Sequence, residues 1–397
     1  MTPERPRIPR TVWALGLVSM FMDISSEMIH SLLPVFLVSS LGASMALVGL
    51  IEGTAEATAA VMKVFSGWLS DRLGKRKLLA GIGYGLGALS KPIFPLAITP
   101  FEVLGARFVD RIGKGMRGAP RDALVADVTP AGQRGAAFGL RQALDTLGAF
   151  LGPVIALGLM VVLHGNMRAV FAWAVIPAAL AVICLILGVE EPARKPGHVA
   201  ARLPIKLAEI RNMGAGYWSV TAVAVVFTLA RFSEAFLVLR ARDAGLSLAL
   251  VPLVLITMNL VYALVAAPAG RLSDRMDRRI LLALGMGVLI LADLILALVP
   301  SLAGVLIGTG LWGLHMGLTQ GLFSALVADA APARLRGTAF GLYNLATGMT
   351  LLAASLIAGA LWSWAGAGST FLAGALMALI ATAGVLFLKP PAPHPET

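Results

Sequence analysis

The sequence has few charged residues and almost no cysteine, and both shortages limit what the chain can be. Only 13% of its 397 residues are charged, whereas a soluble domain carries roughly 25%. Hydrophobic residues make up 58% of the chain, so most of it faces something other than water. The single cysteine, Cys184, lies in an apolar run, where it has no disulfide partner and no metal-ligand spacing. No HExxH, Gly-x-Ser-x-Gly or phosphate-binding loop occurs, so we expect no enzyme, no cofactor and no resident metal.

Apolar runs long enough to cross a lipid bilayer recur along the whole chain. A bilayer core requires about 20 mostly apolar residues per helix. Such runs lie at residues 12–38, 44–69, 78–98, 101–124, 136–162, 169–189, 216–239, 247–270, 280–299, 302–328, 338–362 and 368–388. We therefore predict an all-α integral membrane protein with twelve transmembrane helices.

The basic residues indicate how these spans are oriented. A formal charge of +11 would suggest nucleic-acid binding in a soluble chain, but here the basic residues lie mostly in short loops. With the N-terminus inside the cell, the basic residues left outside are Arg168, Arg240 and Arg242. This asymmetry follows the rule that cytoplasmic loops retain positive charge. We expect cytoplasmic termini, a location in a bacterial inner membrane and no nucleic-acid partner.

Short motifs recur in the two halves of the chain at a nearly constant spacing. The loop GWLSDRLGKR at residues 67–76 returns as GRLSDRMDRR at residues 270–279. LVAD at residues 124–127 returns at residues 326–329. Two related halves are typical of secondary transporters, in which the solute binds near the midplane between the repeats.

The repeat and the composition together predict the domain organisation. The longest polar stretch between spans, rich in proline, arginine and lysine, separates the two sets of six apolar runs. We predict two pseudo-symmetric six-helix bundles at residues 1–189 and 216–397, joined by a cytoplasmic linker at residues 190–215. We expect the protein to be a monomer.

The first copy of the loop resembles the G-x-L-x-D-R-x-G-x-R signature of the major facilitator superfamily. The whole chain resembles the twelve-helix, drug/proton antiporter-like branch of that family. The resemblance implies alternating access, with Asp71 facing the N-terminus of the predicted span 338–362 near Thr338 and holding the cytoplasmic side closed. The residues to which it assigns this gating role are Gly67, Asp71, Arg72, Gly74, Arg76, Gly270, Asp274 and Arg275.

Two further motifs point to the energy source. Arg111 and Gly115 resemble the family's proton-transfer motif R-x-x-Q-G, with Lys114 in the place of glutamine. The run GAFLGP, with Gly148, Gly152 and Pro153, resembles the G-x-x-x-G-P motif associated with antiporters. A small-xxx-small packing face with a proline kink is an alternative interpretation of the second motif.

Charged residues within the spans of the first half lie on shared helix faces. Each charge at the bilayer centre costs at least ~2.5 kcal/mol, so these faces avoid lipid. Carboxylates at that depth suit reversible protonation, because desolvation penalises their charged form. The predicted proton-coupling or substrate residues are Asp23, Glu27, His30, Glu52, Glu56, Arg107, Asp110, Arg111, Lys114, Arg117, Arg141 and Asp145. The predicted cavity residues of the second half are Arg231, Glu234, His315 and Asn344. Structural ion pairs between helices are the alternative for any single residue of these sets.

The leading hypothesis is a secondary transporter that exports a small solute in exchange for protons. Oxygen and imidazole ligands in the first two spans leave a metal-ion or other cation exporter as an alternative. The basic face of the predicted span 101–124 leaves a transporter of an anionic solute as a third possibility.

Overall fold

The computed structural model describes residues 8–191, 210, 213–273, 275–319, 321–332 and 335–388, except for the side chains of Asp71 and Ala131. Contacts divide the chain into two compact units. Unit 1 comprises Met1–Leu32 and Val61–Arg202, and unit 2 comprises Leu33–Ala60 and Leu203–Thr397. The division into bundles at residues 1–189 and 216–397 remains a prediction. The predicted linker at residues 190–215 lies largely outside the described residues.

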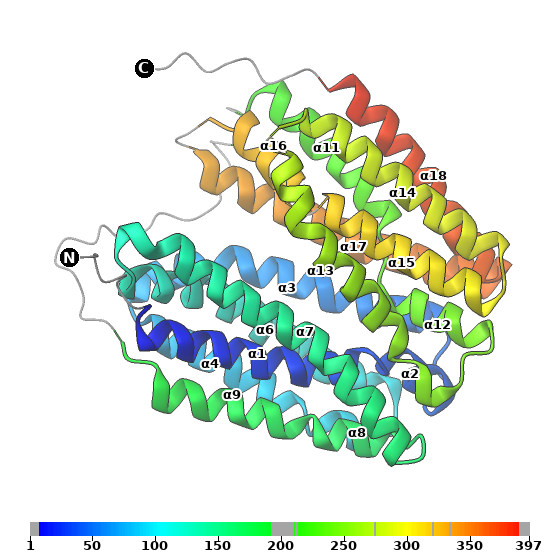
Figure 1. Ribbon diagram of the computed structural model, residues 1–397, viewed down its shortest axis with the longest axis horizontal. Coiled ribbons are helices and arrows are strands. Elements are labelled where there is room, and N and C mark those ends of the chain that lie inside the picture. The colour runs from blue at the N-terminus through cyan, green and yellow to red at the C-terminus, as the bar shows by residue number, and fades with distance from the viewer. Residues whose placement is uncertain are drawn as a thin grey trace, which may run out of the picture. The chain divides into compact units, whose positions relative to one another are not determined.

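Unit 1 is built from helices only in its described part. Its helices are α1 (Arg10–His30), the later part of α3 (Met45–Leu73), α4 (Arg76–Ser90), α5 (Ile93–Leu96), α6 (Pro100–Val128), α7 (Arg134–Val162), α8 (Met167–Trp173) and α9 (Val175–Gly188), with a 3₁₀ turn, η1, at Ala131–Gln133. Helix α1 packs against α7 and α9, and α4 packs against α6 (Figure 1). The buried core joins Leu15 and Met22 of α1 to Tyr84 of α4, Leu124 of α6 and Leu185 of α9.

Unit 2 has the same all-helical character where it is described. Its helices are α2 (Leu33–Ser39), the first part of α3, α11 (Ala215–Ala230), α12 (Ala235–Asp243), α13 (Leu253–Ser273), α14 (Arg278–Leu298), α15 (Leu302–Thr319), α16 (Leu322–Ala330), α17 (Arg336–Ala365) and α18 (Ala367–Phe387), with a 3₁₀ turn, η2, at Leu248–Leu250. Helix α14 packs against α15 and α18, and α11 packs against α17 and α18 (Figure 1). Gly49 of α3 lies directly against the Ser355 carbonyl of α17, and Gly359 of α17 lies against the Met45 carbonyl of α3. This close approach explains why the start of α3 groups with unit 2.

Ten helical segments in the described part of the chain are long and apolar enough to cross a membrane. They coincide with ten of the twelve predicted spans. The other two predicted spans, 78–98 and 101–124, are helical but differ in character. Helix α4 has 15 residues and ends before Lys91 and Pro92, which leaves it short of the bilayer core by itself. Helix α6 has 29 residues, but its charged stripe lowers its apolar character. The total of twelve therefore remains a prediction.

Large apolar side chains cover the outside of the helices. Ile183 and Leu187 of α9 and Leu376 and Phe387 of α18 are exposed in the chain. A soluble protein would lose solubility with so much contiguous exposed apolar surface, whereas lipid tails solvate it. The exposed faces therefore agree with a multi-pass membrane protein.

Local sequence signals set several helix ends. Thr99 and Glu102 form a capping box at the start of α6, with Pro100 at its first position. Gly74 ends α3 with a φ of 61°, which glycine adopts without strain. Asp277 caps α14 by accepting a hydrogen bond from the Arg279 backbone N–H at 2.9 Å. The Arg279 guanidinium also donates to this carboxylate, which lowers the pKa of Asp277.

Candidate functional site

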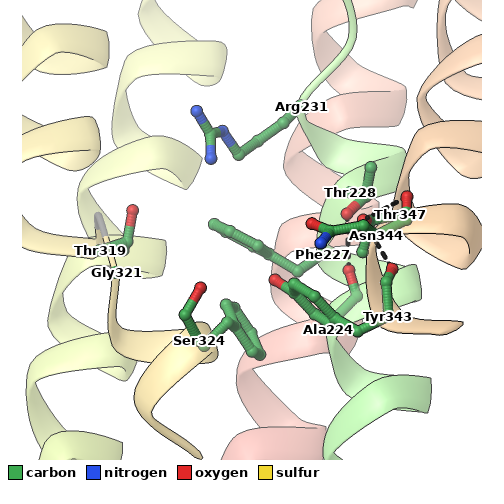
Figure 2. A pocket seen from close by; sticks show the side chains of 11 residues that line it. Ala224, Phe227, Thr228, Arg231, Thr319, Gly321, Ser324, Tyr343, Asn344 and Thr347 are labelled. Atoms are coloured by element: carbon green, nitrogen blue, oxygen red, sulfur yellow. Dashed lines mark hydrogen bonds between the residues drawn. The ribbon is translucent and has the colours of Figure 1, made fainter. Parts of the chain in front are cut away.

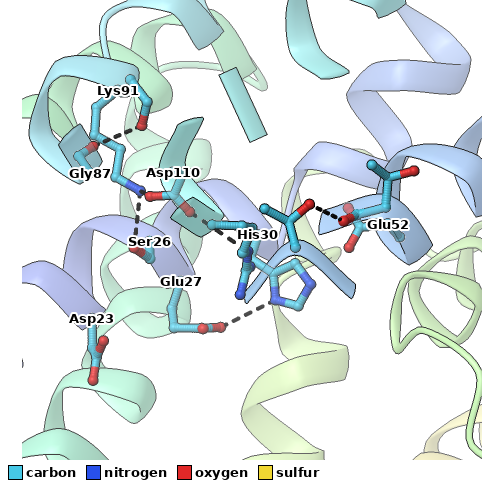
Figure 3. Close-up of polar contacts among 12 residues, drawn as sticks. Asp23, Ser26, Glu27, His30, Glu52, Gly87, Lys91 and Asp110 are labelled. Carbon is cyan, nitrogen blue, oxygen red and sulfur yellow. Dashed lines mark hydrogen bonds and ion pairs between the residues drawn. The ribbon is translucent and has the colours of Figure 1, made fainter. Parts of the chain in front are cut away.

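A deeply buried ion pair of unit 1 joins the end of α4 to α6. Lys91, at the end of α4, donates to the Asp110 carboxylate at 2.8 Å and to the Ser26 hydroxyl of α1 at 3.0 Å (Figure 3). The Arg111 guanidinium lies 3.7 Å from the other Asp110 oxygen. Lys91 is only 1% exposed and Asp110 only 3%. A buried charge needs such partners, because desolvation alone costs several kcal/mol per ion.

A looser pair links α6 to α1 on the same side of the bundle. The Arg117 guanidinium lies 3.6 Å from an Asp23 oxygen and stacks over the Tyr84 ring at 4.8 Å. The Asp23 side chain keeps 26% of its surface exposed, compared with 6% for Arg117. Asp23 therefore combines a nearby cation with access to its surroundings.

A third group of charges connects α6 and α7. Arg141 donates to Asp145 at 2.5 Å, and Arg121 lies 3.7 Å from the other oxygen of the same carboxylate. Arg121 also donates to the Ser19 hydroxyl of α1 at 2.9 Å. Asp122 lies 3.6 Å from the Arg141 Nε. Two arginines and two aspartates thus form one network between α6 and α7, which Ser19 extends to α1.

Glycines allow the helices that carry these charges to approach closely. On α4 and α6, a Cβ atom at Gly83 would lie 2.7 Å from the Gly113 carbonyl, and one at Gly87 would lie 3.3 Å from Arg117. On α7, a Cβ atom at Gly148 would lie 2.6 Å from the Met20 carbonyl, and one at Gly152 the same distance from the Glu27 Cβ. The motif that resembles an antiporter signature is therefore a tight packing face against α1, beside its acidic residues.

Glu27 and His30 form a separate pair at the end of α1. The His30 Nδ1 lies 3.4 Å from a Glu27 oxygen (Figure 3). Helix α1 ends at His30, and α2 begins at Leu33. A break at this point agrees with the discontinuous helices that line solute sites in transporters.

Each repeated loop contributes an arginine to an ion pair within its own unit, from its last position in the first loop and from the position before the last in the second. Arg76 pairs with Asp127 at the end of α6, and Arg278 pairs with Asp329 at the end of α16 at 2.6 Å. The partners belong to the two LVAD motifs, so the repeat in the sequence corresponds to a repeated contact. The side chain of Asp71, and Asp274 altogether, lie outside the described residues, so the predicted gating contact of Asp71 remains a prediction.

Unit 2 contains a cavity of about 300 Å³ at two helix breaks. Arg231 lies in the break between α11 and α12. Gly321 lies between α15 and α16 with a φ of 78°. Asn344 and Tyr343 of α17 complete one side (Figure 2). The predicted cavity residues Arg231 and Asn344 thus come together.

The other predicted site residues do not belong to the lining of this cavity. His315 is fully buried, with its Nδ1 3.0 Å from the Gly285 carbonyl of α14, and Glu234 stands before the first residue of α12. Glu52 and Glu56 belong to unit 2, where Glu52 accepts a hydrogen bond from the Ser233 hydroxyl at 3.5 Å. Of the basic residues on α6, the structure buries Arg107 and leaves Lys114 exposed.

Sequence reasoning missed several members of the network. Lys91 is the single charge of an otherwise uncharged predicted span, and that isolation was the available signal for a buried ion pair. The Ser19 and Tyr84 hydroxyls join the network across long sequence separations, which no local spacing reveals.

A helical chain with repeated membrane-length spans and charges enclosed inside one bundle is a multi-pass membrane protein of the transporter class. The family model of the Major Facilitator Superfamily matches residues 15–239 and 220–397, and the chain belongs to this family.

Known relatives and structures agree with this assignment. An uncharacterised MFS-type transporter of Methanocaldococcus jannaschii is 31% identical over 96% of this chain and 95% of its own length. The quinolone resistance protein NorA of Staphylococcus aureus is 29% identical over 50% of this chain and 48% of its own length. A superposition on the structure of the nucleoside transporter NupG covers 96% of this chain and 100% of the NupG chain, with a TM-score of 0.80. At 13% sequence identity, this likeness shows the fold alone.

Proposed function

We propose that the protein is a secondary active transporter that works by alternating access and exports a small solute across a bacterial inner membrane in exchange for protons. The buried charge network of unit 1 carries this proposal. Asp23, Asp110 and Asp145 each face a basic side chain inside the bundle. Such residues are costly at this depth and mark ion or proton pathways in membrane proteins.

Asp23 is the carboxylate at which proton exchange is expected. Its distance of 3.6 Å from Arg117 corresponds to a gross attraction on the order of 4 kcal/mol at an effective dielectric of 20. A proton on Asp23 removes that attraction and frees Arg117 from α1. Its exposed surface gives the proton access that the enclosed Lys91–Asp110 pair lacks. Binding and release of the proton would thereby alter the contact between α1 and α6.

Export of an organic solute is supported by the antiporter-like glycine face and by the partial relative. Gly148 and Gly152 hold α7 against the part of α1 that carries Asp23 and Glu27. The relative NorA is named for quinolone resistance, so a quinolone is a reasonable first probe for this chain.

Two measurements on the purified protein test this function. A thermal-shift screen against divalent metals, organic cations, organic anions and norfloxacin first identifies a ligand. Proteoliposomes then report uptake of that ligand driven by a pH gradient, and counterflow exchange without a gradient. We expect Asp23→Asn to abolish gradient-driven uptake and to retain counterflow. Asp243→Asn, outside the network, is the matched control and should behave like the wild type. Gradient-driven uptake at the wild-type rate in Asp23→Asn would contradict the proposal.

The metal-exporter alternative gains little from the geometry. Within the residues that the structure describes, no group of three or more histidine, cysteine, aspartate or glutamate side chains is placed to hold a metal ion. On the basic face of α6, Arg117 and Arg121 already face carboxylates. An anionic solute therefore finds a better cation outside that face.

A further inference from the structure

We propose that the cavity of unit 2 binds the carboxylate of a small aromatic organic anion through Arg231. This inference specifies the solute class of the transporter proposed above, and it rests on that function for its biological meaning. The site itself is argued from unit 2 alone.

The charge of the cavity favours an anion. Among the described residues that line it, Arg231 is the one cationic side chain and none is acidic. The Arg231 Nε is buried, and no residue in the described part of the chain accepts a hydrogen bond from it. Figure 2 shows the guanidinium extending from the end of α11 over the cavity. Glu234 attracts the guanidinium but does not line the cavity. A buried donor without an acceptor is costly, and a carboxylate would satisfy the planar guanidinium with two parallel hydrogen bonds.

The walls of the cavity favour an aromatic body on that anion. Phe227 and Phe323 pack with their ring centroids 5.2 Å apart and form an apolar wall. The Arg231 guanidinium lies 5.7 Å from the Phe227 ring centroid, so the cation and the apolar wall meet at one place. Ser324 and Asn344 add polar groups to the lining. A volume of about 300 Å³ is at the lower end for ligand pockets, which suits a small molecule.

The helix breaks explain why polar recognition is possible at this depth. Irregular backbone inside a membrane protein is tolerated where it lines a cavity. Arg231 and Gly321 both occupy such breaks and both line this cavity. Their coincidence is a second observation, independent of charge, that points to a ligand site.

Binding measurements in detergent, without any pH gradient, test the site. Calorimetric titration compares 2-naphthoate with 2-naphthamide, which has the same rings without the charge. We expect the wild type to prefer the acid by about tenfold or more, since a charge-assisted pair to arginine is strong. Arg231→Gln should weaken acid binding by about ten- to a hundredfold and leave amide binding unchanged. Arg271→Gln, the same change at an exposed residue of unit 2, should bind like the wild type.

Ser324→Asp provides a second variant if Arg231→Gln fails to fold. It places a carboxylate at an exposed position of the cavity lining and should abolish the preference for the acid. Equal affinities of the wild type for acid and amide, an absence of binding up to millimolar ligand, or full acid binding by both variants would overturn the proposal. Because no gradient is present, loss of proton coupling in Asp23→Asn leaves these results unaffected. Failure of the anion site and failure of proton exchange are therefore distinguishable.

Discussion

Replacing Gly152 with alanine tests whether the antiporter-like motif is a close packing face. The added methyl would lie 2.6 Å from the Glu27 Cβ, 2.9 Å from the Ile24 carbonyl oxygen and 3.2 Å from the Met28 amide nitrogen. Carbon atoms prefer separations of about 3.5–4.0 Å, so α7 would have to move from α1 by about 1 Å. Overpacking of this kind costs about 1–3 kcal/mol.

The matched control is Gly158→Ala on the same helix, where a methyl would meet nothing within 4 Å. There the higher helix propensity of alanine should stabilise the protein by up to about 1 kcal/mol. Each kcal/mol shifts the melting temperature by roughly 2–4 °C for a unit of this size. Thermal unfolding in detergent, followed by size-exclusion chromatography, should therefore show shifts of opposite sign. Equal shifts for the two variants would refute the packing argument.

Two buried groups give further predictions, each checked by thermal unfolding. Lys91→Met leaves the Asp110 carboxylate without its closest cation and should lower the free energy of unfolding by about 3–5 kcal/mol. Adding Asp110→Asn should recover part of that stability. A double variant no more stable than Lys91→Met would contradict this prediction. Asp293 is fully buried and accepts from the Trp312 indole N–H at 2.9 Å. Asp293→Leu should therefore cost about 1–3 kcal/mol, while Asp293→Asn keeps the acceptor; equal stability of these two variants would show that this hydrogen bond does not matter.

The sequence by itself determined the character of the protein and much of its local structure. Apolar runs of about 20 residues fix helices, because the bilayer leaves backbone groups no other partner. The proline at position 100 and the glycine at position 74 set helix ends through their own backbone geometry. The duplicated loops predicted two related halves, since the loop and the LVAD motif both recur at nearly the same spacing.

The tertiary structure decided which charges meet. Helical periodicity placed Asp23 and Glu27 on one face, but it could not pair Asp23 with Arg117 on a different helix. Lys91 is the single charge of its predicted span, and its ion pair with Asp110 forms only because α4 and α6 pack closely through glycines. Ion pairing depends on separations of a few ångströms between helices distant in sequence, and those separations are set by packing rather than by local pattern.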